Sequence, residues 1–94
     1  MARVTWSSKA LDELDAICNF TAETSPRRGR KLWEDLFSAT DRLETFPRYG
    51  RVVPEIRDEA LREIIHRGYR LLYHISEDEV KVLTVFHSAK PFGP

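Results

Sequence analysis

The segment that follows Pro26 is rich in cationic residues, namely Arg27, Arg28, Arg30 and Lys31, and contains no acidic residue before Glu34. Ser25 can cap a helix and Pro26 suits its first turn, so these cations fall where the helix dipole disfavours positive charge. Guanidinium and ammonium groups at this density can bind carboxylates or phosphates. We therefore consider this basic cluster a candidate contact for an acidic protein or for DNA; the alternative is a solvated face without a partner.

Two further side chains with possible chemistry lie in the C-terminal third, Arg70 and His87. A guanidinium fork suits a phosphate, and an imidazole titrates near neutral pH and can act as an acid or a base. Strand alternation places Arg70 on the face opposite that of Tyr69 and Tyr73. An arginine paired with a carboxylate such as Glu63 would look identical in sequence, so a structural ion pair stays open beside the functional role.

Other reactive residue types favour structural roles. Cys18 falls four residues after Leu14 on an apolar stripe and is expected in the core. Tyr69 and Tyr73 share a strand face with apolar residues, which favours core packing over ligand contact. The histidines have no metal-ligand spacing with Cys18 or with one another, so we expect neither a metal nor a cofactor.

Composition limits the class of protein. The 94 residues suffice for one domain, residues 1–94, and 15 Lys plus Arg balance 15 Asp plus Glu. A nucleic-acid role would therefore have to rest on a local patch, because the net charge supplies no positive field. A single cysteine suits a reducing cytoplasm, and neither a signal peptide nor an apolar run long enough for a membrane span is recognisable.

The elements that must position these residues follow from hydrophobic periodicity. We predict a first strand over Arg3–Trp6, a helix over Lys9–Ala22, and a long second helix from Pro26 to Phe46, ended by Pro47. The apolar face of the second helix is expected at Leu32, Leu36, Ala39, Leu43 and Phe46.

The remainder of the chain is predicted to be rich in strands. Residues Arg48–Glu59 indicate a loop, and Leu61–Ile65, Tyr69–Ile75 and Val80–His87 indicate three strands, the last two joined by a hairpin turn over Ser76–Glu79. The order β-α-α-β-β-β predicts an α+β domain. In it, an antiparallel helical hairpin packs on one face of a mostly antiparallel four-stranded sheet.

The segments Leu61–Ile75 and Asp78–His87 resemble the RelE/ParE superfamily of bacterial toxins. Their Gly-Tyr-Arg-x-x-Tyr core at residues 68–73, the acidic turn and the late His87 carry this resemblance together. It extends over nearly the whole chain, since Phe46–Arg51 also precedes the sheet in the family's order. The resemblance implies the toxin of a type II toxin–antitoxin system, of the kind that stabilises plasmids, with either of two activities.

RelE-like members of this superfamily cleave messenger RNA on the ribosome. On that reading Arg70, His87 and Lys90 would be the catalytic residues, because cleavage needs an acid, a base and cations beside the phosphate. The sequence departs from the RelE-like pattern in several ways. No tyrosine follows Tyr73, His87 precedes a serine, and acidic or apolar residues stand at Glu63 and Ile65 where RelE-like enzymes carry basic residues.

ParE-like members instead poison DNA gyrase without catalysing a reaction. The Leu-Arg-Glu lead-in at residues 61–63 and the apolar last strand ending in His87 resemble them more closely. We therefore favour a ParE-like gyrase poison, neutralised by a cognate antitoxin in a hetero-oligomer; a toxin-like remnant that only binds its antitoxin is a third possibility. The residues expected to contact partners are Arg27, Arg28, Arg30, Lys31, Arg67, Arg70, His87 and Lys90.

Overall fold

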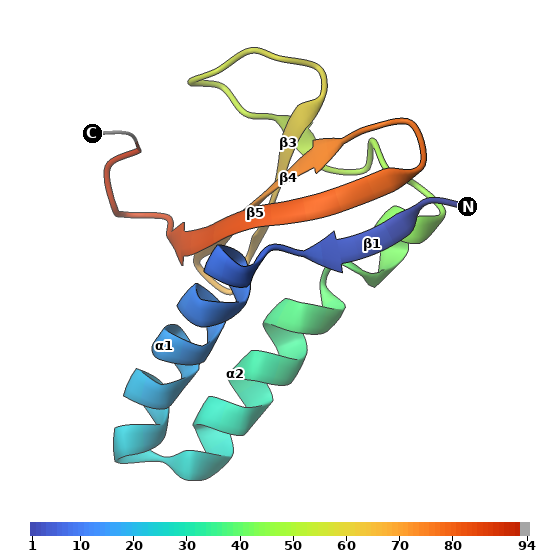
Figure 1. Ribbon diagram of the computed structural model, residues 1–94. Helices are drawn as coiled ribbons and strands as arrows, with labels where there is room; N and C mark the ends of the chain where they lie inside the picture. Colours follow the sequence, from blue (N-terminus) through green and yellow to red (C-terminus); the bar gives the residue numbers. More distant parts are fainter. Residues whose placement is uncertain (93–94) are drawn as a thin grey trace.

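Residues 1–92 are described by a computed structural model and form two layers, a helical hairpin and a sheet (Figure 1). The helices are α1 (Ser8–Thr24) and α2 (Pro26–Ser38), followed by the short 3-10 helix η1 (Asp41–Glu44). The strands are β1 (Arg3–Trp6), β2 (Arg51–Val52), β3 (Leu61–His66), β4 (Tyr69–Ile75) and β5 (Glu79–His87). The α+β class and the helical hairpin are therefore confirmed.

The sheet has five strands in the order β1-β5-β4-β3-β2, one more than predicted. β1 runs parallel to β5, and the other neighbouring pairs are antiparallel. The additional strand, β2, lies in the segment predicted to be a loop, where Arg51 and Val52 pair with Glu63 and Arg62 of β3. A strand of two residues is too short to show alternation, so only its pairing with β3 reveals it.

The first helix agrees with its prediction, whereas the second ends eight residues before Phe46, at Ser38. The hydroxyls of Ser38 and Thr40 donate hydrogen bonds to backbone carbonyls of Asp35 and Phe37 (3.4 and 2.9 Å), which competes with continuation of the helix. The chain then tightens into η1. Phe46 is 63% exposed, so its expected place on the apolar helical face was wrong.

The core lies between the hairpin and one face of the sheet. Leu14 and Cys18 of α1, Leu36 of α2, and Leu71 and Tyr73 of β4 are buried there together, which confirms the expected core roles of Cys18 and Tyr73. Figure 1 shows that the turn between α1 and α2 extends away from the sheet. The tip of the hairpin is therefore open to a partner.

Close contact between the two helices depends on Gly29, which is buried against α1. A Cβ atom at this position would lie 2.7 Å from both the Cys18 carbonyl oxygen and the Ala22 Cβ. Because neither atom can move away cheaply, only glycine allows α2 to pack this closely. The close packing of the two helices at Gly29 therefore holds the segment that contains the basic cluster.

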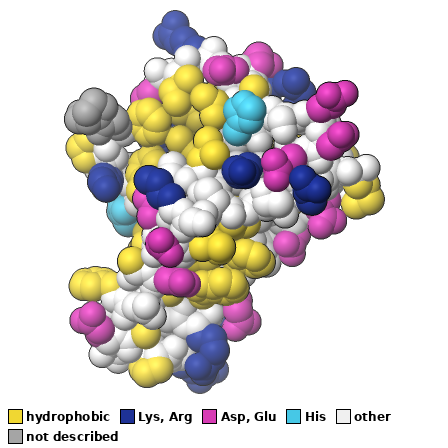
Figure 2. All heavy atoms as spheres, in the orientation of Figure 1, with side chains coloured by type: hydrophobic (Ala, Val, Ile, Leu, Met, Phe, Trp, Pro, Cys, Tyr) yellow, Lys and Arg dark blue, Asp and Glu magenta, His cyan; other side chains and the backbone are white. Residues whose placement is uncertain are grey.

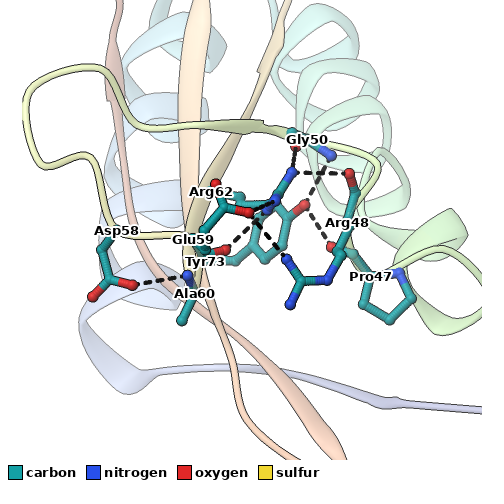
Figure 3. A network of polar contacts seen from close by, with 8 residues as sticks. All are labelled: Pro47, Arg48, Gly50, Asp58, Glu59, Ala60, Arg62 and Tyr73. Carbon is teal, nitrogen blue, oxygen red and sulfur yellow. Dashed lines mark hydrogen bonds and ion pairs between the residues drawn. The ribbon is translucent and has the colours of Figure 1, made fainter.

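The segment between η1 and β3 is held by a polar network (Figure 3). The Tyr73 hydroxyl donates to the Pro47 carbonyl and accepts from the Gly50 N–H, both at 2.8 Å. Arg62 donates to the Gly50 carbonyl at 3.0 Å and pairs with Glu59. These bonds fix the connecting segment against the sheet, although it contains little regular structure. None of the helices in residues 1–92 is long and apolar enough to cross a membrane.

Candidate functional site

Arg70 lies at the centre of a buried ion-pair cluster on the sheet face that points away from the helices. Its Nε donates to Glu63 at 2.6 Å, and its two terminal nitrogens donate to the two carboxylate oxygens of Glu55 at 2.9 Å each. The second oxygen of Glu63 accepts from the Arg51 Nε at 2.7 Å. The structural alternative for Arg70, a pair with Glu63, is therefore present in the structure.

Burial and charge make this cluster distinct from the surface ion pairs. The side chain of Glu63 is 0% exposed and that of Arg70 is 8% exposed. Hydrogen bonds from the Arg70 guanidinium lower the pKa of Glu55 to about 2 and raise the pKa of Arg70 itself. Phe86 and Phe92 flank the guanidinium, each with its ring centroid 5.4 Å from the Arg70 Cζ. An external phosphate would have to displace carboxylates and aromatic rings to reach it.

His87 lies on the other face of the sheet. In the register of β4 and β5, Tyr69 pairs with His87 and Arg70 pairs with Phe86. Successive strand residues point to opposite faces, so the side chain of Arg70 lies with Phe86, and that of His87 lies with Tyr69. The contacts agree, since the His87 ring meets the Tyr69 ring edge-on at 5.4 Å between centroids. The structure therefore does not bring Arg70 and His87 together.

His87 and Lys90 do share a surface, a groove between α1 and β5. This α1–β5 groove is lined by Glu13, Ala16, Ile17, Phe20, Tyr69, Val85, Phe86, His87 and Lys90 and has a volume of about 410 Å³. Phe20 is 74% exposed at its helical wall. An apolar groove with an exposed aromatic residue and a few polar groups suits the apolar face of a partner helix.

The basic cluster and Arg67 surround a second hollow, at the tip of the helical hairpin. Its volume is about 920 Å³, and its cationic lining residues are Arg27, Arg28, Arg30, Lys31 and Arg67. Figure 2 shows dark-blue side chains gathered at the lower end of the molecule, where the hairpin turn lies. We call this feature the hairpin-tip hollow. The expected partner-binding cations on α2 and in the β3–β4 turn therefore lie together.

Arg67 reaches this hollow through the tight turn that joins β3 to β4. Both turn residues, Arg67 and Gly68, have positive φ angles, of 52° and 84°. Such φ values are typical of the two-residue turns that connect antiparallel strands. Asp35 of α2 binds the guanidinium of Arg67 and the ammonium of Lys31, and these contacts lower its pKa. Asp35 thereby connects the β3–β4 turn to α2.

Two residues of these surfaces escaped the sequence interpretation. Glu55 lies in the irregular segment before β3 and binds Arg70, which follows 15 residues later on β4. Phe20 follows the apolar residues of α1, but its side chain is exposed. No local sequence pattern identifies Glu55 as the partner of Arg70. For Phe20, an aromatic residue close to the predicted end of the first helix is the only indication in the sequence. Within residues 1–92, no group of three or more His, Cys, Asp or Glu side chains is arranged to hold a metal ion.

Comparisons with known proteins give consistent results. The family model described as ParE toxin of type II toxin-antitoxin system, parDE, matches residues 4–92. Toxin RelE2 of Caulobacter vibrioides is 29% identical over 91 residues, which cover 96% of this chain and 99% of that protein. A solved structure, the chromosomal ParDE TA system from P. aeruginosa, has a TM-score of 0.79 at 19% identity and covers 93% of this chain and 96% of its own.

Proposed function

Because the chain belongs to the ParE toxin family of type II toxin–antitoxin systems, we propose that it inhibits DNA gyrase and is neutralised by a cognate antitoxin. On this proposal it catalyses no reaction of its own. It acts in the cytoplasm by occupying a surface of gyrase so that cleaved DNA is not resealed. The family establishes a toxin, whereas the choice of gyrase as its target rests on the arrangement of side chains described above.

The observation that carries the choice is the separation of the candidate ribonuclease residues. Arg70 and His87 lie on opposite faces of the sheet, and the guanidinium of Arg70 is occupied by Glu63 and Glu55. Cleavage of RNA through its 2′-hydroxyl needs an acid, a base and a cation around one phosphate. His87 and Lys90 line one groove without that arginine, which favours a binding role over catalysis.

The second candidate is a RelE-like ribosome-dependent ribonuclease, which the name of the Caulobacter relative favours. On this alternative, His87 and Lys90 would act from the α1–β5 groove, and replacing either by alanine should lower RNA cleavage by orders of magnitude, on the order of 100-fold or more. A third candidate, a non-toxic remnant that only binds its antitoxin, predicts no effect on gyrase or on translation.

Supercoiling and translation measured with the same purified protein separate these candidates. A gyrase poison should inhibit supercoiling of relaxed plasmid and accumulate cleaved plasmid after detergent and protease treatment, while a cell-free translation reaction proceeds normally. Uninhibited supercoiling together with cleavage of ribosome-bound mRNA would refute the proposal in favour of the ribonuclease. No effect in either reaction would also refute it, in favour of the remnant.

We place the apolar face of an antitoxin helix in the α1–β5 groove, where Phe20 offers an exposed aromatic anchor. A hot-spot residue at the centre of an interface contributes about 2 kcal/mol or more, so Phe20→Ala should weaken antitoxin binding by about 30-fold if Phe20 is such an anchor. The matched control is Phe46→Ala, because Phe46 is also largely exposed but lies beyond η1, outside the groove. Equal effects of the two substitutions on antitoxin affinity would exclude the groove as the docking site.

A further inference from the structure

The hairpin-tip hollow has a strongly one-sided charge in a chain whose net charge is zero. Among the lining residues that the structure describes, five are cationic and only Glu34 is acidic. The α2 helix begins at this point, and its first turn contains no acidic residue. The positive end of the helix dipole therefore adds to the field of the side chains instead of being offset by a carboxylate.

Three of the five cations are free of carboxylate partners. Asp35 engages Lys31 at 3.0 Å and also engages Arg67. Arg27, Arg28 and Arg30 are exposed, and none of them forms an ion pair within the part of the chain that the structure describes. This differs from Arg51, Arg62 and Arg70, each of which pairs with a glutamate. Arg42 and Arg57 also form no ion pair among the described residues, but they do not line this hollow, so it is the gathering of three unpaired arginines around one hollow that sets the hairpin tip apart.

The remaining lining residues decide which kind of anion fits. Thr21, Ser25 and Leu32 complete the lining as far as residues 1–92 are concerned, and Leu32 is buried, so these residues offer no exposed aromatic or large apolar anchor. Protein interfaces gain most of their energy from such anchors. Single-stranded nucleic acids are bound by stacking bases on aromatic rings, which are also missing from this lining. A duplex backbone needs neither, because its phosphates are bound through charge and hydrogen bonds alone.

We propose that the hairpin-tip hollow binds the phosphate backbone of duplex DNA through Arg27, Arg28 and Arg30, without reading its sequence. The guanidinium fork of each arginine can donate two hydrogen bonds to one phosphate. The contact lies on a surface different from the α1–β5 groove, which leaves an antitoxin or another protein free to bind there. The inference does not rest on the gyrase target, since binding to naked DNA needs no gyrase.

The test is fluorescence anisotropy of a labelled 20-base-pair duplex titrated with the purified chain between about 50 and 200 mM salt. For contacts with three phosphates, the slope of log K against log salt should be about −2.7. Arg27→Glu/Arg30→Glu should reduce the size of that slope by about 1.8 and weaken binding at 50 mM on the order of 100-fold. Binding should not depend on the sequence of the duplex.

The matched control is Arg57→Glu/Lys81→Glu, which makes the same change of formal charge at exposed residues outside the hollow. It should retain most of the affinity and the slope of the unmodified chain. We expect the hairpin variant to fold, because Arg27→Glu places an acidic residue in the first turn of α2, where the helix dipole favours it, and Arg30 is exposed. Thermal unfolding should accordingly show an unchanged or higher Tm.

Three results would overturn the proposal. One is equal DNA affinity of the hairpin variant and the unmodified chain. Another is an equal loss in the control variant, which would show that only total charge matters. The third is loss of antitoxin or gyrase binding in the hairpin variant with DNA binding intact, which would make the hollow a protein-docking surface. If the unmodified chain binds DNA as expected but does not inhibit supercoiling by gyrase, only the proposed function is refuted.

Discussion

Replacing Glu63 by glutamine should lower the free energy of unfolding by about 3 kcal/mol. The Glu63 side chain is fully buried, and both of its oxygens accept charged hydrogen bonds, from Arg70 at 2.6 Å and from Arg51 at 2.7 Å. Glutamine has nearly the same shape but offers one oxygen and one NH₂ group. One of the two guanidinium donors would therefore face another donor.

The magnitude follows from what the partners retain. Removing one member of a buried ion pair typically costs about 3–5 kcal/mol. Arg70 keeps its two bonds to Glu55, and Arg51, whose side chain is 57% exposed, can turn towards water. Both facts put the loss at the lower end of the range. With an m-value of about 1.5 kcal/mol/M, the urea midpoint should fall by about 2 M.

The assay is equilibrium urea unfolding followed by tryptophan fluorescence and far-UV circular dichroism. Glu59→Gln is the matched control, since the Glu59 side chain is 75% exposed and its carboxylate is solvated. Its partner Arg62, although only 12% exposed, keeps its hydrogen bonds to the backbone carbonyls of Glu59 and Gly50. Exposed pairs contribute about 0–1 kcal/mol, so this variant should stay close to the unmodified chain. A loss below about 1 kcal/mol for Glu63→Gln, similar to the control, would refute the reasoning that the buried cluster stabilises the fold.

Further expectations concern pH, a buried hydroxyl and the thiol. Hydrogen bonds from Arg70 are the main reason that the folded-state pKa of Glu55 is lowered to about 2. The stabilisation of the fold by the ionised Glu55 carboxylate should therefore be present above pH 4.5 and be lost as pH falls towards 2. Over that interval, the urea midpoint of Glu55→Gln should fall less than that of the unmodified chain. Tyr73→Phe leaves the buried N–H of Gly50 without an acceptor and should lower the free energy of unfolding in urea by about 1–3 kcal/mol. An unchanged free energy of unfolding would show that this bond does not hold the connecting segment. Burial raises the pKa of Cys18 to about 11, so alkylation by iodoacetamide at pH 8 should be on the order of 100-fold slower in the folded chain than in urea, and equal rates would contradict its place in the core.

Local patterns in the sequence were sufficient for most of the elements and for the family, although they missed β2 and placed the end of the second helix too late. Ser7 and Ser25 cap the two helices through hydrogen bonds to backbone N–H groups within the first turn, and such caps need only neighbouring residues. The acidic turn after Ile75 joins β4 to β5 as expected, with the Ser76 N–H bound to the Glu79 carbonyl. The α+β class and the resemblance to the toxin family follow from the same local information.

The relation between Arg70 and His87 was not accessible in this way. Whether two residues on neighbouring strands share a face depends on register, and a slip of one residue moves every side chain of a strand to the other face. The register of β4 and β5 also changes between Leu72 and Tyr73, where the pairing is irregular. Only the assembled sheet decides that these two candidate catalytic groups point away from each other.

The sequence by itself determined where the cations are, and the tertiary structure decided which of them are available. The basic cluster after Pro26 is visible in the chain, and its place at a helix start follows from the Ser25-Pro26 signal. Glu55 and Glu63 bind Arg70, whereas Arg27 and Arg30 have no carboxylate partner within residues 1–92, and this difference depends on contacts between residues distant in sequence. Such contacts are set by packing of the whole domain, which no local pattern records.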